Sequence, residues 1–337
     1  MLGHEWAAQL LATHIARRET RHAYLFTGPP GVGRRSLALR FAQALNCIHP
    51  PAPGLPCGAC RPCAQIEKMQ QSDLAVVQAL DEDGIPKEGG SLKIDQIRDL
   101  QRGLSLSPYE SKLRVALLLR FEEANANAQN AFLKTLEEPP EKAILLLTAS
   151  ASENLLPTIS SRCEVLRLRP LPVAELEAAL QSRWSLEPGE ARRLAHLSGG
   201  RAGYALRLHN DPTELQRRQE WLEDLQRLLG QNRRERFSYA EHEFKEREAL
   251  RRVLPVWLSF WRDVLLTACG SSAPLTNLDQ AEGISRLAER MDAGIVRQRV
   301  SDLEQAVGRL DANVNARLLG EVLLLDWPRI SIADSQA

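Results

Sequence analysis

Four cysteines lie close together in the first part of the chain: Cys47, then Cys57, Cys60 and Cys63 in the segment CGACRPC. Overlapping C-x-x-C steps let neighbouring thiolates grip one ion while the small residues between them turn the chain. Four thiolates fill a tetrahedral shell and leave no open position, so the spacing predicts a structural zinc module over residues 46–66. The alternative is a set of redox-active or free buried thiols.

The segment LFTGPPGVGRRS, residues 25–36, has the glycine frame of a phosphate-binding loop, G-x-x-x-x-G-K-[ST]. In such a loop the lysine reaches the β- and γ-phosphates and the hydroxyl binds Mg²⁺. Here Arg34 and Arg35 stand at those two positions. Arg34 can still meet a phosphate, although its planar fork is not equivalent to an ammonium group, and Arg35 cannot ligate a cation. The candidate nucleotide-binding residues are Gly28, Gly31, Gly33, Arg34 and Arg35.

A second test of the nucleotide site comes from the apolar segment RVALLL, residues 114–119. An aspartate that binds Mg²⁺ should follow such a strand directly, with a glutamate beside it. The chain has Arg120 and Phe121 there, and Glu122 and Glu123 come two residues late. Because both magnesium ligands are missing, we expect no Mg²⁺ site and interpret the loop as a structural turn. Retained nucleotide binding is the alternative.

Ser161, Arg162 and Cys163 form a third candidate site in the segment TISSRC, just before another apolar run. An arginine projected from such a loop can stabilise the charge that develops on a transferred γ-phosphoryl group of another subunit, as an arginine finger. The tripeptide alone is a weak signal, and a solvated or capping arginine is the alternative. Its place after a P-loop fold makes Arg162 the candidate.

Strands and helices must position these residues, and apolar runs that alternate with helical patterns predict where these elements lie. The alternation predicts an α/β domain with a parallel sheet covered on both faces. Strands are expected at residues 23–27, 72–80, 114–119, 143–149 and 164–170. Helices are expected at residues 35–45, 94–106 and 126–140, the last of them ended by Pro139 and Pro140.

Beyond Pro170 the pattern becomes helical. Short helices between Pro/Gly turns predict a small helical lid domain at 170–209, after an α/β domain at 1–169. Two longer apolar runs predict a helical bundle at 210–330 that also packs on neighbouring subunits, with a tail at 331–337. The second run consists of Leu303, Val307, Leu310, Val314, Leu318 and Val322.

The amino-acid composition disfavours some classes of function. Among 337 residues, Lys+Arg and Asp+Glu are both 43 and aromatic residues make up 5%. Such a balance disfavours a zinc-dependent DNA-binding protein, because phosphate contacts need a basic surface. No apolar run approaches the roughly 20 residues of a membrane span, and the N-terminus lacks the pattern of a signal peptide. We therefore expect a soluble, cytoplasmic protein.

Several segments together resemble one family. They are HAYLFTGPPGVG (22–33), the four-cysteine insertion, LKIDQIRDL (92–100), AQNAFLKTLEEPP (128–140), LLPTISSRCEVLRL (155–168) and DANVNARLLGEVLLL (311–325). Along nearly its whole length the chain resembles the delta-prime subunits of the bacterial DNA polymerase III clamp loader, which belong to the AAA+ superfamily. The resemblance implies an AAA+ domain, a lid and a helical collar.

The resemblance also implies a role. Delta-prime subunits act as non-catalytic stators in a complex that loads the sliding clamp onto primed DNA, together with a delta subunit and ATP-hydrolysing gamma/tau motor subunits. They supply the arginine of the SRC motif, here Arg162, to a neighbouring ATP site. The zinc module is shared, so Cys47, Cys57, Cys60 and Cys63 carry over one for one. The chain would lack ATPase activity yet belong to a nucleotidyltransferase holoenzyme.

Departures from the motor-subunit pattern separate two interpretations. A motor subunit should keep the P-loop lysine, the hydroxyl and the acidic pair, and this chain keeps none of them. Gly203 stands where a motor subunit places a nucleotide-sensing arginine, with Arg201 nearby, and Thr148 fits a polar sensor position. The alternative is an active gamma/tau-like ATPase that uses Arg34 for phosphate and Glu122 or Glu123 for the metal.

Overall fold

The computed structural model describes residues 2–81, 83–87, 89–311 and 314–330, so the expected tail at 331–337 lies outside the described residues. The chain divides into two compact units. One consists of Met1–Leu171 with Arg201–Tyr204, and the other of Pro172–Gly200 with Ala205–Ala337.

A five-stranded parallel sheet in the order β2-β3-β4-β1-β5 forms the centre of the first unit. The strands are β1 (Ala23–Thr27), β2 (Leu74–Val77), β3 (Arg114–Leu118), β4 (Ala143–Ala149) and β5 (Glu164–Arg167). Every residue of β1 and β4 is buried. The continuous apolar runs are thus explained by a sheet that is covered on both faces.

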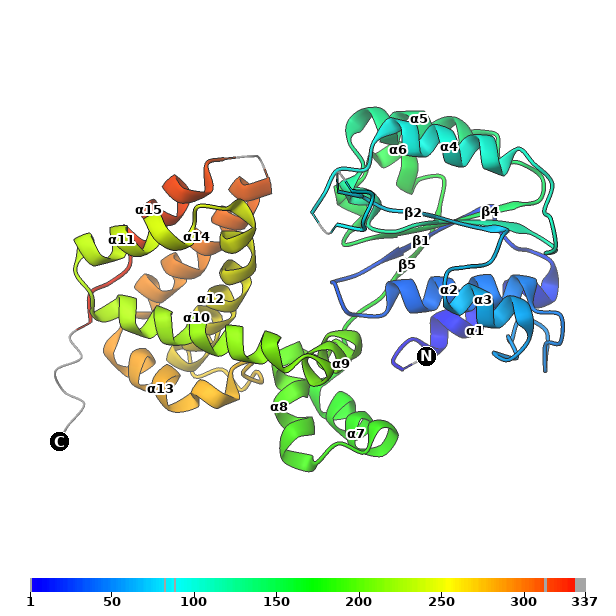
Figure 1. Cartoon of the computed structure of the whole chain (residues 1–337). Helices are drawn as coiled ribbons and strands as arrows, with labels where there is room; N and C mark the ends of the chain where they lie inside the picture. The colour runs from blue at the N-terminus through cyan, green and yellow to red at the C-terminus, as the bar shows by residue number, and fades with distance from the viewer. Residues whose placement is uncertain (1, 82, 88, 312–313, 331–337) are drawn as a thin grey trace. The chain divides into compact units, whose positions relative to one another are not determined.

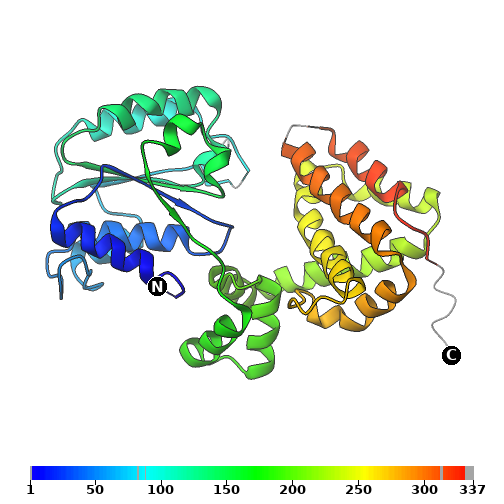
Figure 2. The ribbon, with the colours of Figure 1, turned by 180° about the vertical axis from the view of Figure 1, so that it is seen from behind.

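Helices cover the two faces of this sheet as separate layers (Figures 1 and 2). One layer holds α1 (Glu5–Arg17), α2 (Arg34–Asn46) and α3 (Arg61–Glu67); the other holds α4 (Ile94–Leu104), α5 (Ala126–Glu137) and α6 (Pro157–Ser160). Successive strand residues serve opposite layers: Tyr24 and Phe26 join the core under α2, and Leu25 joins the core under α5. The expected α/β fold class is confirmed.

The second unit is helical, as expected. Its helices are α7 (Val173–Trp184), α8 (Pro188–Ser198), the greater part of α9 (Ala202–Asn210), α10 (Pro212–Gly230), α11 (Arg233–Glu243), α12 (Arg247–Ala268), α13 (Ala281–Arg290), α14 (Ala293–Asp311) and α15 (Ala316–Leu325). Fully buried Trp257 and Trp261 of α12 pack against Trp327 at the centre of its core. Within the described ranges, no helix has the length and apolarity needed to cross a membrane.

The second apolar run of the sequence is divided between two helices of this unit. The apolar run from Leu303 to Val322 does not form one core face, because it is divided between α14 and α15. Leu303 and Leu310 are buried, whereas Val314, Leu318 and Val322 are 40, 57 and 45% exposed. Val307 of α14 is also 37% exposed, so the exposed residues of the run are found on both helices.

Candidate functional site

The structure brings the four predicted cysteine ligands together. The Sγ atoms of Cys47, Cys57, Cys60 and Cys63 all lie within 4.8 Å of one another, and those of Cys47 and Cys60 are 3.9 Å apart. A tetrahedral zinc ion with Zn–S bonds of about 2.3 Å separates its sulfur ligands by about 3.8 Å. The cluster therefore fits a metal ion held by four thiolates.

Backbone groups around the cluster favour the thiolates of Cys57 and Cys60, whereas burial raises the pKa of Cys63. The N–H of Cys57 donates to the sulfur of Cys47 (3.4 Å), and the N–H of Cys60 donates to the sulfur of Cys57 (3.3 Å). Burial of Cys60 opposes its ionisation, but hydrogen bonds with the backbone of Ile48 and Cys63 outweigh burial and lower its pKa to about 6. Backbone N–H groups that donate to sulfur stabilise these ligands in their metal-binding form.

Neighbouring elements hold the cysteine module against the first unit. The side chain of Gln43 in α2 donates to the carbonyl of Cys63 (2.9 Å), and Lys112 donates to the carbonyl of Cys47 (3.1 Å). Gly54 has a φ of +78°, and a Cβ there would lie 2.5 Å from the backbone of Ala12 in α1. The module is thus packed directly on α1 and α2, which suits a structural centre.

The glycine loop keeps the shape of a phosphate-binding loop between β1 and α2. Gly28, Gly31 and Gly33 have φ angles of +143°, +81° and +112°, a region that favours glycine. A Cβ on Gly28 would lie 2.4 Å from the carbonyl oxygen of Leu168. The glycines therefore have an architectural reason to be present, independent of any phosphate.

A segment far away in sequence closes over this loop. The N–H of Gly203 donates to the carbonyl of Gly31 (2.9 Å). A Cβ on Gly203 would lie 2.8 Å from that oxygen, and a Cβ on Gly31 would lie 2.8 Å from the Cβ of Tyr204. Glycine at the position expected for a sensing arginine is thus required by close packing of residues 201–204 on the loop.

The arginines that replace the lysine and the first acid each lie beside one of the two glutamates after β3. Arg34 is buried, and its Nη1 lies 3.9 Å from Glu122 Oε1, which accepts a hydrogen bond from the backbone of Ser150 (2.9 Å). Arg35 is exposed. Glu123 accepts from Arg120 Nε (2.9 Å) and from the N–H of Gly89 (2.8 Å). The structure thus brings Arg34 and Glu122 together and directs Glu123 elsewhere.

Thr148 and Arg120, at two further positions of the predicted nucleotide site, contact each other. Arg120 has a φ of +50° and its N–H donates to the Thr148 hydroxyl (2.9 Å). The predicted sensor hydroxyl therefore holds the backbone of the residue that replaces the expected acid.

Arg162 lies on the turn between α6 and β5. Its Nη1 donates to the carbonyl of Thr158 (2.9 Å), and its Nη2 donates to Glu137 Oε1 (2.8 Å). The side chain remains 36% exposed. Arg162 is consequently ordered and accessible at the same time.

The two neighbours of Arg162 behave differently. Ser161 is exposed, and its hydroxyl donates to the same Thr158 carbonyl (3.2 Å). Cys163 packs against the core of the first unit, and burial raises the pKa of its thiol to about 12. Cys163 therefore acts as a small hydrophobic anchor beneath the arginine.

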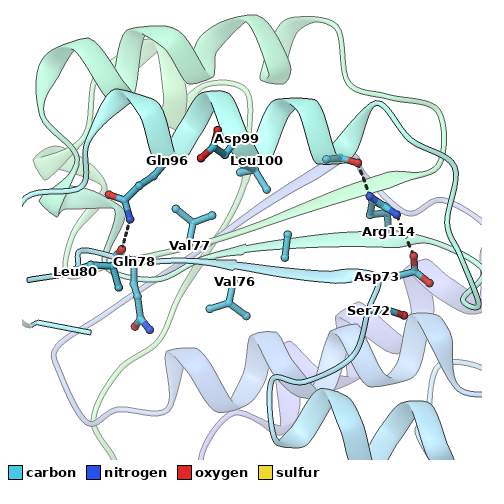
Figure 3. A pocket seen from close by; sticks show the side chains of 12 residues that line it. Ser72, Asp73, Val76, Val77, Gln78, Leu80, Gln96, Asp99, Leu100 and Arg114 are labelled. Atoms are coloured by element: carbon cyan, nitrogen blue, oxygen red, sulfur yellow. Dashed lines mark hydrogen bonds and ion pairs between the residues drawn. The ribbon is translucent and has the colours of Figure 1, made fainter. Parts of the chain in front are cut away.

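A hollow of about 400 Å³ along the edge strand β2 contains none of the predicted site residues (Figure 3). Its main acid, Asp73, accepts hydrogen bonds from the N–H groups of Tyr109, Glu110 and Ser111. Burial of Asp73 works against ionisation, but these bonds prevail and hold the pKa below its usual value. Asp73 thus serves to fix the loop before β3.

Three features of these sites were not predicted from the sequence. They are the contact of Glu137 with Arg162, the contact of Gly31 with Gly203, and the pairing of Arg34 with Glu122. Each joins segments that no local spacing connects. The only signal for Glu137 is its place at the end of a helix that precedes two prolines.

Comparisons with known proteins indicate the same family for the N-terminal and the C-terminal part of the chain. A family model described as DNA polymerase III, delta subunit, matches residues 3–172, and a model of the C-terminal part of the same family matches residues 212–329. The chain is 31% identical over 327 residues to DNA polymerase III subunit delta' of Bacillus subtilis, covering 94% of both chains. It is 37% identical over 233 residues to subunit delta' of Pseudomonas aeruginosa, covering 67% of each.

Similarity to motor-type subunits is shorter. DNA polymerase III subunit tau of Bacillus subtilis is 34% identical over 164 residues, which cover 49% of this chain and 27% of tau. The chain is thus of the DNA polymerase III delta class, with an α/β domain and a helical C-terminal region. Within that class it belongs to the delta' family.

Proposed function

We propose that the protein is the stator subunit of a bacterial DNA polymerase III clamp loader. It would assemble with gamma/tau-type motor subunits and a delta subunit, and would meet the sliding clamp and primed DNA as part of that complex. The 1–169 domain would form one position of the ring, 170–209 its lid and 210–330 its collar. Family membership supports this assignment.

The proposal that this subunit does not hydrolyse ATP itself rests on the difference between its glycine loop and the surroundings of Arg162. At its own glycine loop, Arg34 lies beside Glu122, Thr148 binds the backbone of Arg120, and Gly203 binds Gly31. Arg162 instead projects with exposed N–H groups. An arginine in this setting suits a neighbour's γ-phosphate, where it would stabilise developing charge in trans.

The zinc module would be a structural part of the same subunit. Cys47, Cys57, Cys60 and Cys63 would hold Zn²⁺, which would supply a rigid crosslink and no open coordination position.

The test of the finger role is Arg162→Ala in the reconstituted complex. Folding and assembly should be retained because the side chain is on the surface, whereas ATP turnover should fall. Arginine fingers are worth roughly 10³–10⁵ in rate in GTPase systems, which sets the upper range. The measurement is steady-state ATPase activity with clamp and primed DNA, with Arg167→Ala, another exposed arginine of the same domain, as control. Unchanged turnover would contradict the role.

A motor-type ATPase remains the second candidate, because Arg34 and Glu122 lie 3.9 Å apart at the loop, where phosphate and metal would bind. Magnesium-dependent turnover by the purified chain that disappears on Glu122→Ala or Glu123→Ala would favour it over the stator. The stator proposal expects no turnover by the isolated chain and no change in binding of a fluorescent ATP analogue on addition of Mg²⁺.

A further inference from the structure

Two acceptors on different elements hold the Arg162 guanidinium. Thr158, in α6, accepts from Nη1 through its carbonyl, and Glu137, the last residue of α5, accepts from Nη2 through its carboxylate. An arginine has five N–H donors, and these contacts use two of them. The other three have no partner among the residues that the structure describes. The two hydrogen bonds therefore hold the guanidinium in place, while 36% of the side chain stays exposed to solvent.

Both acceptors stand on rigid supports. Leu136, next to Glu137, and Ile159, next to Thr158, are buried in the same hydrophobic core. The side chain of Gln129 in α5 also accepts a hydrogen bond from the N–H of Leu156 at the start of α6 (3.0 Å). This bond ties the two helices together, so the positions of the two acceptors are set by the fold.

We propose, building on the finger role assigned to Arg162 above, that Glu137 is a positioning residue for that arginine. A free arginine side chain samples many rotamers, whereas stabilisation of a transferred phosphoryl group requires one. The ion pair with Glu137 selects a rotamer that leaves three N–H donors without a partner among the described residues and the side chain 36% exposed. Glu137 acts through Arg162 and does not itself touch the nucleotide.

The test uses the complete loader with clamp and primed DNA, and compares Glu137→Ala, Glu137→Gln and Arg162→Ala with the unchanged chain. Because the ion pair is half exposed, its removal should lower the kcat for ATP about two- to fivefold. The KM for ATP should stay the same, because the arginine acts in the transition state. Glu137→Gln retains an acceptor oxygen and should recover part of the rate.

Glu138→Ala is the matched control, because this neighbouring carboxylate is exposed and the described structure records no ion pair for it. It should leave kcat unchanged. In the double variant, Glu137→Ala should add nothing to Arg162→Ala, because a positioning residue has no effect once its target is gone.

Each outcome separates this role from the finger role. A fall in kcat with Arg162→Ala but not with Glu137→Ala would overturn the positioning role and leave the finger role intact. A rise in kcat with Glu137→Ala would also overturn it, since Glu137 would then restrain the arginine. Unchanged turnover with Arg162→Ala would overturn both roles. Equal thermal melting of Glu137→Ala and the unchanged chain would exclude misfolding as the cause.

Discussion

Two glycines decide what the loop between β1 and α2 can accommodate. The carbonyl of Gly31 accepts from the N–H of Gly203, and each position lacks room for a β-carbon. An arginine at position 203, as a nucleotide-sensing residue would require, would collide with the loop it should serve. At the scale of single residues, the glycines of this loop are therefore explained by internal packing.

Gly203→Ala tests this packing. The added methyl would lie 2.8 Å from the Gly31 oxygen, so the free energy of unfolding should fall by about 1–3 kcal/mol. Gly103→Ala, in helix α4 of the same unit, is the control: its nearest neighbour would be 4.0 Å away, and alanine should be neutral or stabilising by up to about 1 kcal/mol. Urea denaturation followed by circular dichroism measures both. Equal stability of Gly203→Ala and the unchanged chain would contradict the contact.

Sequence reasoning reached the residues whose partners are near in the chain. The four cysteines share a short segment, so their spacing predicts the cluster. The sequence did not predict the contact of Gly203 with Gly31 or that of Glu137 with Arg162, because those contacts depend on how distant segments pack. The pattern showed that Arg34 was unusual but not that Glu122 lies next to it.

At the scale of elements, the cysteine module links α2, α3 and the loop before β3. Cys47 directly follows α2 and Cys63 lies in α3, while Lys112 connects the module to the loop before β3. A metal ion at this place would fix the start of α3 relative to the end of α2. Its contribution is expected to be local stability of residues 46–66.

Removal of the metal should therefore loosen this module first. Cys60→Ser should lower bound zinc from about one equivalent per chain to a small fraction, because structural sites need all four ligands, and should increase hydrogen exchange in residues 46–66. Cys269→Ser, at an exposed cysteine, should change neither. Mass spectrometry of the native protein gives both readouts. Four thiols that titrate freely without release of metal would show that the zinc assignment is wrong.

Elements themselves were largely predictable. The buried strands and the helix stopped by Pro139 follow from apolar runs and proline chemistry, although β2 and β5 are shorter than expected. The break between α14 and α15 was not predictable, because the apolar residues continue at helical spacing across it. The helical spacing of apolar residues alone does not reveal where one helix ends and the next begins.

At the scale of the whole molecule, the exposed part of the second apolar run identifies a candidate assembly surface. Val314, Leu318 and Val322 recur at every fourth position and lie exposed on and just before α15, in the segment assigned to the collar. A row of exposed apolar side chains in a subunit of a complex is expected to pack against a partner. The proposed partners are the helical regions of the other loader subunits.

Leu318→Glu should leave the isolated chain folded, because the side chain is exposed, and should weaken assembly roughly tenfold or more by placing a charge in an apolar contact. Trp184→Glu changes an exposed apolar residue of α7 and should leave assembly unchanged. Analytical ultracentrifugation with the motor and delta subunits compares them. Wild-type affinity for Leu318→Glu would exclude this surface.

The strand order has a consequence for synthesis of the chain. β1 lies between β4 and β5, and its register pairs Ala23 with Leu145, about 120 residues later. At about 5–20 residues per second, the ribosome needs roughly 6–24 s to supply that partner. During this interval a wholly apolar segment has no sheet to join, whereas the four cysteines emerge early and within a short span. The nascent chain can thus bring its four cysteines together long before β1 is covered by its neighbouring strands.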